Sequence, residues 1–311
     1  MKFKMLGLVL GVLAMTGCAT TGFRAGAPDG AIDVIAHRGA SAYAPENTLA
    51  SFKLARELNA DWFELDCTLT KDGQVIVIHD DDTERTASVP GKVAKMTLAE
   101  LKALDAGSWK APEFAGERMP TLAEALDLAR NLQIGVYIEI KDSANDYALM
   151  RGILEATQDA KTLSARQRGQ VAGMIRDSRS LNYQLTLDVI KLIRERRMKR
   201  QVVIQSFSPI VCAVSLHEAP EIRTEFLAAK DEKKPEQWPY VLRWDQLLGA
   251  AGFNLDIDTV DRDTVPRLHS EKKTIAVWTV DDEETMRRLA DWGVDAIITN
   301  KPDLCLRVLG R

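Results

Sequence analysis

Two of the four histidines in the sequence stand where a side chain could exchange a proton. His37 follows the apolar run of residues 32–36 and precedes Arg38, and His79 ends a second apolar run at residues 75–78. Imidazole changes charge close to neutral pH, so two histidines can supply a general base and a general acid. The plain alternative is that His37 and Arg38 form only a turn at the end of a strand.

Four charged side chains repeat one spacing in two apolar segments. Glu64 and Asp66 are two residues apart in WFELDCT, and Glu139 and Lys141 are two apart in IGVYIEIK. Residues i and i+2 of a strand point to the same face. If that face is a packed interior, the charges must be paired, hydrogen-bonded or bound to a metal ion. The alternatives are a structural ion-pair network, or Glu and Lys side chains solvated at a barrel mouth.

These residue types together predict chemistry on a phosphoric ester. Three carboxylates without a cysteine favour a hard divalent cation, Ca²⁺ or Mg²⁺, over zinc. Arg38 and Lys141 could hold an anionic oxygen, Arg38 through its forked donors. An anionic substrate, a metal ion, an acid and a base are the parts of phosphoryl-ester catalysis.

The remaining histidines and cysteines give no sign of a second site. His217 and His269 lie in the polar contexts SLHEAP and RLHSEKK, which are typical of the surface. Cys67, Cys212 and Cys305 are widely spaced and form no C-x-x-C pair, which argues against a disulfide framework or a zinc site. We expect them to be buried free thiols.

Short β-branched runs alternate with amphipathic segments along most of the chain. Eight strands separated by helices predict a (β/α)8 TIM barrel, in which active sites lie at the carboxyl ends of the strands. A doubly wound open sheet is the second choice, but no G-x-G-x-x-G follows the first strand. The strand candidates are residues 32–36, 62–68, 134–140, 201–206, 222–228, 253–257, 274–279 and 295–298.

Two segments depart from simple alternation. The turn at residues 71–73 joins strand 62–68 to the apolar run 75–78, and so short a link predicts an antiparallel hairpin. Such a hairpin would place His79 roughly opposite residues 65–66. The span of residues 142–200 is long and largely helical in pattern, so we expect extra helices on the barrel rather than a second domain.

The amino-terminal segment predicts export. Two lysines precede an apolar run too short to span a bilayer, and small residues lead to Cys18. This segment resembles the lipobox of bacterial lipoproteins, although Met15 stands where Leu is usual. The alternative is a simple secretion signal. We expect a signal peptide at residues 1–17, lipidation of Cys18, and a flexible tether at residues 18–30. The protein would then be anchored in a membrane and face the periplasm or the cell exterior.

Composition excludes other broad classes. A chain of 311 residues with 46% hydrophobic and 28% charged residues is an ordinary globular protein, and residues 31–311 are expected to form one catalytic domain. The net charge of −4 gives no global attraction to nucleic acid, so we expect no such partner. The oligomeric state is left open.

Several segments together resemble the glycerophosphodiester phosphodiesterase family of the phospholipase C-like superfamily. In order they are AHRGASAYAPENTLASF, FELDCTLTKDGQVIVIHD, MTLAELKALDAG, PTLAEAL, IEIK, QSF, VWTV and ITNKPD, spanning roughly residues 32–305. The resemblance implies a TIM barrel with a short insertion after the second histidine. It also implies a catalytic pair, His37 and His79, and a first loop supported by Glu46 and Asn47.

The resemblance extends to the ligands of the site. It implies Ca²⁺ or Mg²⁺ on Glu64, Asp66 and Glu139. It further implies that Arg38 and Lys141 contact phosphate and that Trp278 faces the substrate. The expected activity is hydrolysis of glycerophosphodiesters to glycerol 3-phosphate and an alcohol. The alternatives are lysophospholipase D-like hydrolysis on the same site and a non-catalytic lipoprotein that binds glycerophosphodiesters. The long 142–200 span and the compact segment after His79 leave the head group open.

Overall fold

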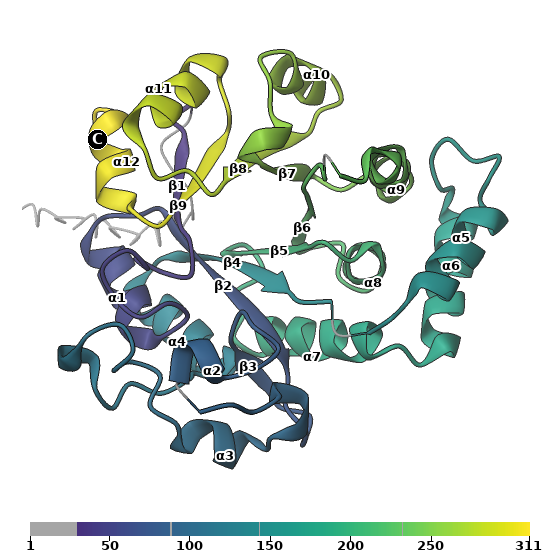
Figure 1. Ribbon diagram of the computed structural model, residues 1–311. Helices are drawn as coiled ribbons and strands as arrows, with labels where there is room; N and C mark the ends of the chain where they lie inside the picture. The colour runs from purple at the N-terminus through teal and green to yellow at the C-terminus, as the bar shows by residue number, and fades with distance from the viewer. Residues whose placement is uncertain (1–29, 88, 143, 232) are drawn as a thin grey trace, which may run out of the picture.

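The computed structural model is a closed barrel of eight parallel strands surrounded by helices (Figure 1), and it describes residues 30–311 except positions 88, 143 and 232. The strands pair in the order β1-β9-β8-β7-β6-β5-β4-β2, and β1 pairs with β2 to close the barrel. The predicted (β/α)8 fold is confirmed, and each predicted strand end lies within one residue of the observed one. The parallel strands are β1 (Asp33–Ala36), β2 (Trp62–Leu69), β4 (Gly135–Ile140), β5 (Val202–Ser206), β6 (Arg223–Ala228), β7 (Gly252–Asp256), β8 (Thr274–Trp278) and β9 (Ala296–Thr299).

The alternating side chains of β2 divide between two environments. Leu65 and Cys67 are fully buried in the apolar layer between barrel and helices, together with Phe52 of α1. Glu64 and Asp66 point to the barrel interior, as the period of two requires. A layer of apolar and aromatic side chains fills the interior near the strand starts, including Trp62 of β2. The charged positions of β2 therefore lie beyond this layer, toward the carboxyl ends of the strands.

The antiparallel hairpin is confirmed. β3 (Val75–Val77) pairs with β2 through Cys67 and Val77, and Gly73 takes a positive φ of 73° in the connecting turn. The backbone N–H of Ile78 donates to the carbonyl of Asp66 at 3.0 Å. Continuing this register places His79 opposite residue 65, at the predicted height on the barrel.

The helices begin where capping residues stand. Thr97 and Thr121 form capping boxes with Glu100 and Glu124, as their spacing predicts. The helices are α1 (Leu49–Glu57), α2 (Glu84–Ala87), α3 (Leu98–Ala103), α4 (Leu122–Leu132), α5 (Tyr147–Ala156), α6 (Ala165–Ser178), α7 (Leu181–Glu195), α8 (Pro209–Glu218), α9 (Trp238–Leu248), α10 (Thr264–Ser270), α11 (Glu283–Trp292) and α12 (Pro302–Val308). Single 3₁₀ turns lie at Val93–Lys95, Pro112–Phe114, Pro235–Gln237 and Ile257–Thr259.

The long span 142–200 forms three helices. α7 packs between α4 and α8 as a barrel helix, whereas α5 and α6 pack on each other at the edge of the molecule, with α6 against α8 (Figure 1). Ile153 of α5 and Ile175 of α6 belong to the same apolar cluster as barrel residues such as Val34. The expectation of extra helices on the barrel, rather than a second domain, is therefore met.

The span between β3 and α4 builds a small substructure over the hairpin. It contains α2 and α3, and its own apolar cluster joins Ile76 and Ile78 to Ala87, Val93 and Leu101. These contacts fix the chain that follows His79. This substructure is the insertion that the sequence resemblance implied.

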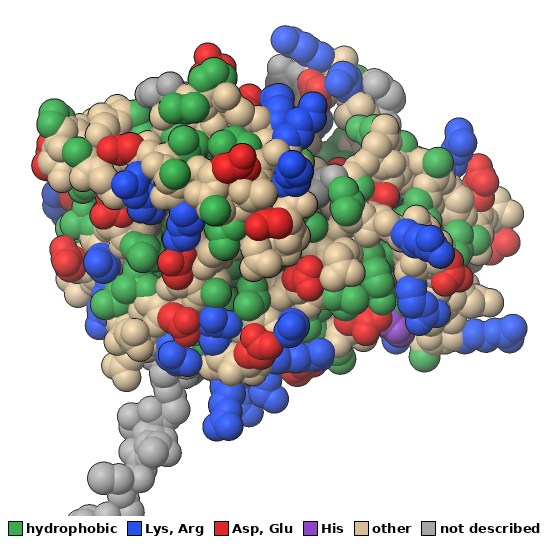
Figure 2. All heavy atoms as spheres, turned by 90° about the horizontal axis from the view of Figure 1, so that it is seen from below, with side chains coloured by type: hydrophobic (Ala, Val, Ile, Leu, Met, Phe, Trp, Pro, Cys, Tyr) green, Lys and Arg blue, Asp and Glu red, His purple; other side chains and the backbone are tan. Residues whose placement is uncertain are grey.

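Surface and terminal features complete the description. His217 and His269 are exposed, and Cys67, Cys212 and Cys305 are buried free thiols, as predicted. Acidic and basic side chains are interspersed on the face shown in Figure 2. Among residues 30–311, apart from the undescribed positions, no helix is both long and apolar enough to cross a membrane. The predicted signal peptide and Cys18 lie outside the described residues.

Candidate active site

Three carboxylates meet inside the barrel at the carboxyl ends of two adjacent strands. Glu64 and Asp66 of β2 and Glu139 of β4 each bring an oxygen atom within 4.8 Å of the others. Asp66 lies beside Glu139 in the β2–β4 ladder. Glu64 and Asp66 are only 2% and 1% exposed. The structure thus brings together the three carboxylates that the two-residue spacing placed on one face.

Burial and mutual repulsion make this cluster hard to ionise fully. Burial, followed by repulsion from Asp66, raises the pKa of Glu139 to about 7 and raises the pKa of Glu64 well above its usual range. Burial also opposes ionisation of Asp66, but the charges of Arg38 and Lys141 hold the pKa of Asp66 below its usual value. Three buried oxygen donors that need additional positive charge to ionise together fit a hard divalent cation.

Two cations stand on either side of the cluster. Lys141 Nζ lies 2.9 Å from Glu139 Oε1 and 3.6 Å from Asp66 Oδ1. Arg38 Nε lies 3.4 Å from Asp66 Oδ2, and Arg38 Nη1 donates to Glu46 at 2.9 Å. Both cations line a cavity of about 100 Å³ that also contains Glu64 and Glu139. An anion entering this cavity would meet a guanidinium and an ammonium.

The first loop bends sharply to place these groups. Arg38 and Gly39 both take positive φ, 55° and 79°. A Cβ on Gly39 would lie 2.6 Å from the carbonyl carbon of Ser51, so only glycine lets the loop approach α1 this closely. Asn47 donates to Asp66 Oδ2 at 2.8 Å and accepts from the Asp66 N–H at 3.2 Å. The loop therefore fixes one carboxylate of the cluster as well as Arg38.

His37 has a neutral amide as its partner. Its Nδ1 lies 2.8 Å from Asn300 Oδ1, which also accepts from Ser41. The Asn300 amide nitrogen donates to Asp281 at 2.5 Å, which sets the direction of the amide. Because the amide oxygen can only accept, His37 must donate through Nδ1, leaving Nε2 with a lone pair. Burial, followed by the charge of Arg38, lowers the pKa of His37 to about 4.

His79 has a carboxylate as its partner. Its Nδ1 lies 2.6 Å from Asp80 Oδ1, and the other Asp80 oxygen accepts from Arg85 Nε at 2.6 Å. Burial works against ionisation of Asp80, but the bonds from Arg85 and His79 lower the pKa of Asp80 to about 2. The carboxylate of Asp80 fixes the orientation of the imidazole ring through Nδ1 and leaves Nε2 for other contacts. The two histidines therefore have unlike partners.

An aromatic pair closes the other side of the cavity. Trp278 and Phe207 meet edge to face with ring centroids 5.6 Å apart, and both line the cavity. Trp278, for which the resemblance implied a place facing the substrate, therefore faces this cavity. Sequence reasoning did not single out Phe207, Asn300, Asp80 or Arg85. The motifs QSF, ITNKPD and HD contain the first three of these residues but do not indicate which side chain each one contacts, and none of the three motifs contains Arg85.

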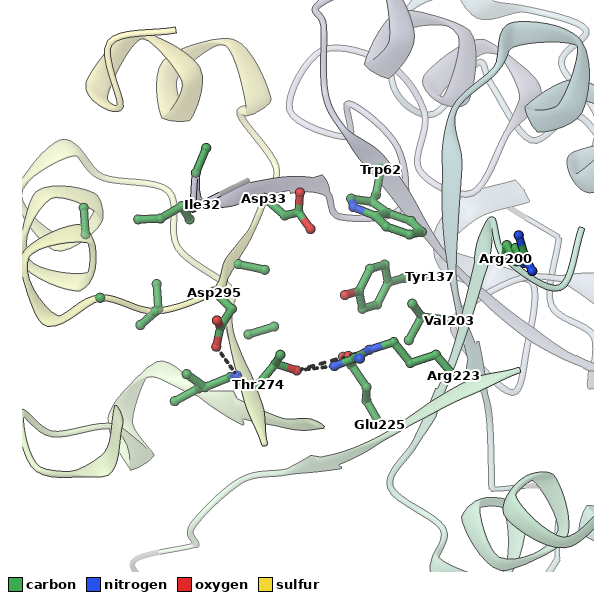
Figure 3. Close-up of a pocket in the computed structure, with 18 residues that line it drawn as sticks. Ile32, Asp33, Trp62, Tyr137, Arg200, Val203, Arg223, Glu225, Thr274 and Asp295 are labelled. Atoms are coloured by element: carbon green, nitrogen blue, oxygen red, sulfur yellow. Dashed lines mark hydrogen bonds and ion pairs between the residues drawn. The ribbon is translucent and has the colours of Figure 1, made fainter. Parts of the chain in front are cut away.

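A larger cavity, of about 670 Å³, lies at the opposite end of the barrel (Figure 3). Asp33, Trp62, Arg223 and Thr274, which line it, each begin a strand. Arg223 pairs with buried Glu225 at 2.5 Å and also donates to Thr274. Size alone would favour this cavity, but it lacks the histidines and the carboxylate cluster. Active sites of this fold lie at the carboxyl ends of the strands, so we assign the chemistry to the smaller cavity.

Comparison with known proteins identifies the family of the chain. The sequence model of the "Glycerophosphoryl diester phosphodiesterase family" matches residues 37–304. The chain belongs to this family. Its members are phosphoric diester hydrolases, and this chain is therefore an enzyme of that class.

Individual relatives of the family cover nearly the whole chain. A glycerophosphodiester phosphodiesterase of Caldanaerobacter subterraneus subsp. tengcongensis is 35% identical over 281 residues, covering 89% of this chain and 97% of the relative. One from Bacillus subtilis (strain 168) is 32% identical over 283 residues, covering 88% and 85%. The structure of an Oleispira antarctica phosphodiesterase in complex with the product sn-glycerol-3-phosphate has a TM-score of 0.71 at 26% identity, covering 90% and 97%.

The close approach of Gly39 to α1 predicts a local stability effect. Gly39→Ala adds a Cβ against Ser51 and forces an unfavourable φ, so we expect a loss of about 2–4 kcal/mol in the free energy of unfolding. Gly73→Ala is the matched control, because Gly73 also has a positive φ but nothing within 4 Å of its would-be Cβ. Its loss should be about 1 kcal/mol. Chemical denaturation measures both, and equal losses would contradict the close-contact argument.

Proposed function

We propose that the protein hydrolyses glycerophosphodiesters to glycerol 3-phosphate and an alcohol with the help of a divalent cation. The observation that carries this proposal is the convergence, on one cavity, of the carboxylate cluster through Glu64 and Glu139, two fixed cations and two histidines with unlike partners. Arg38 and Lys141 would bind the phosphate. When bound by Glu64, Asp66 and Glu139, Ca²⁺ or Mg²⁺ would supply positive charge to the phosphate.

The unlike partners suggest which histidine is the base. His37 is neutral at pH 7, because its pKa is about 4, and its Nε2 carries the lone pair. We propose that Nε2 of His37 accepts the proton of the attacking oxygen. That oxygen belongs to water or to the neighbouring glycerol hydroxyl. In the second case a cyclic phosphate forms first and water opens it afterwards.

The same reasoning makes His79 the acid. As the attacking oxygen bonds to phosphorus, the bond from phosphorus to the alcohol oxygen breaks. The leaving alkoxide then takes the proton from His79 Nε2, and Asp80 stabilises the charged imidazole until that transfer. His37 has then gained a proton and His79 has lost one, and both changes reverse when the product leaves.

Hydrolysis of sn-glycero-3-phosphocholine tests the function directly. We expect turnover by the wild type, loss of turnover with EDTA, and at least a hundredfold lower kcat in His37→Ala, since a general base contributes about 10²–10⁴-fold. Turnover that is unchanged both by EDTA and by His37→Ala would refute the mechanism. Faster turnover of lysophosphatidylcholine would favour the lysophospholipase D-like alternative. Binding without turnover would favour the non-catalytic one.

We also propose that the protein is exported and anchored through lipidated Cys18, in a membrane whose aqueous side is the periplasm or the cell exterior. The lipobox-like sequence supports this proposal. Gly30 and Ala31 line the cavity at the amino-terminal strand ends, so the chain reaches the barrel on the face opposite the active site. In cells given radiolabelled palmitate, wild-type protein should carry label and pellet with membranes, and Cys18→Ser should do neither. Label on the Cys18→Ser protein would refute the anchor.

A further inference from the structure

One arginine connects the two halves of the active site. Arg85 of α2 donates through Nε to Asp80 at 2.6 Å, and through Nη1 and Nη2 to the two carboxylate oxygens of Glu46 at 2.7 and 2.8 Å. Asp80 holds His79, and Glu46 holds Arg38. A continuous chain of charge-assisted hydrogen bonds therefore runs from one histidine to the arginine at the phosphate side.

We propose that Arg85 is a positioning residue for the proton transfer to the leaving alcohol. It acts through Asp80, whose carboxylate it fixes so that His79 keeps its Nδ1 bonded and its Nε2 proton turned toward the substrate. The inference rests on the proposed function, in which His79 is the acid. Arg85 itself lines neither the small cavity nor the carboxylate cluster.

Buried neighbours in α2 fix the backbone position of Arg85. α2 is short, but its residues Thr86 and Ala87 are buried, and Ala87 packs in the same apolar cluster as Ile78, the neighbour of His79. Bidentate pairing with Glu46 fixes the plane of the guanidinium. Rigid backbone on one side and a two-point ion pair on the other leave the Nε–H aimed at Asp80.

Loss of Arg85 should affect Arg38 and His79, at the two ends of this series of hydrogen bonds, unequally. Arg38 would keep two further contacts, its backbone N–H to Glu64 at 2.8 Å and its Nε to Asp66 at 3.4 Å. Asp80 would lose the partner of its Oδ2 and with it the restraint on its rotation. The main effect therefore falls on His79 and on proton donation, rather than on phosphate binding.

A comparison of two leaving groups tests this inference. Ethanolamine leaves as a basic alkoxide that needs a proton, whereas p-nitrophenol leaves as a stable anion that does not. For Arg85→Met we expect kcat on sn-glycero-3-phosphoethanolamine to fall about 10–100-fold, within the range of general acid catalysis. On the p-nitrophenyl ester of glycerol 3-phosphate kcat should fall less than about threefold, and KM should change little for either substrate.

Three further variants make the result specific. Lys92→Met is the matched control, because it breaks the 3.0 Å Lys92–Asp82 ion pair in the same substructure and should leave both activities unchanged. Arg85→Lys keeps the charge but not the fork, so it should fall between the wild type and Arg85→Met. His79→Ala should show the same dependence on the leaving group more strongly. Thermal unfolding of each variant checks that it is folded.

The outcomes separate the two proposals. No turnover by the wild type would refute the proposed function. Turnover by the wild type with no dependence on the leaving group in His79→Ala would refute the acid role of His79, and the role of Arg85 with it. If His79→Ala shows the dependence but Arg85→Met slows both substrates equally, or neither, the positioning role alone is wrong.

Discussion

Mutual repulsion among three buried carboxylates is the constraint on which the active site depends. Glu64, Asp66 and Glu139 lie within 4.8 Å of one another in a barrel interior that would otherwise be filled by apolar side chains. Burial of one unpaired charge is costly, and burial of three is sustained only by compensating charge. Arg38 and Lys141 supply part of that charge. The sharp bend at Gly39 fixes the position of Arg38. The side-chain amide of Asn47 holds Asp66.

The same barrel gives its two histidines different environments. His37 follows β1, which pairs with β9, and its imidazole contacts the side-chain amide of Asn300 in the segment after β9. His79 follows the antiparallel β3, nearer to solvent, and meets the carboxylate of the next residue. A buried place and a neutral partner suit the base role that we propose for His37, and a carboxylate partner suits the acid role that we propose for His79. In that proposal the two roles follow from the strand that precedes each histidine.

The strands and the carboxylate cluster were predictable from the sequence, because both depend on short-range periodicity. Strand pattern placed Glu64 and Asp66 on one face, and parallel pairing brought Glu139 beside them. Side-chain partners were not predictable, because they come from distant segments: His37 and Asn300 are 263 residues apart, and Arg85 and Glu46 are 39 apart. The helical pattern of residues 142–200 was also visible, but not that α6 packs on α8, since an amphipathic face does not specify its partner.

We propose that the buried carboxylates form a cation site whose occupancy is linked to protons. Calorimetric titration of metal-free protein with Mg²⁺ and Ca²⁺, from about pH 6 to about pH 8 in buffers of different ionisation enthalpy, measures that linkage directly. Because the pKa of Glu139 is about 7 and that of Glu64 is raised, a cation must displace protons at the lower pH. Proton release should be greater near pH 6, and affinity should rise with pH, about tenfold per unit for each proton released. Affinity that is independent of pH, or equally tight binding by Glu139→Gln, would contradict the claim.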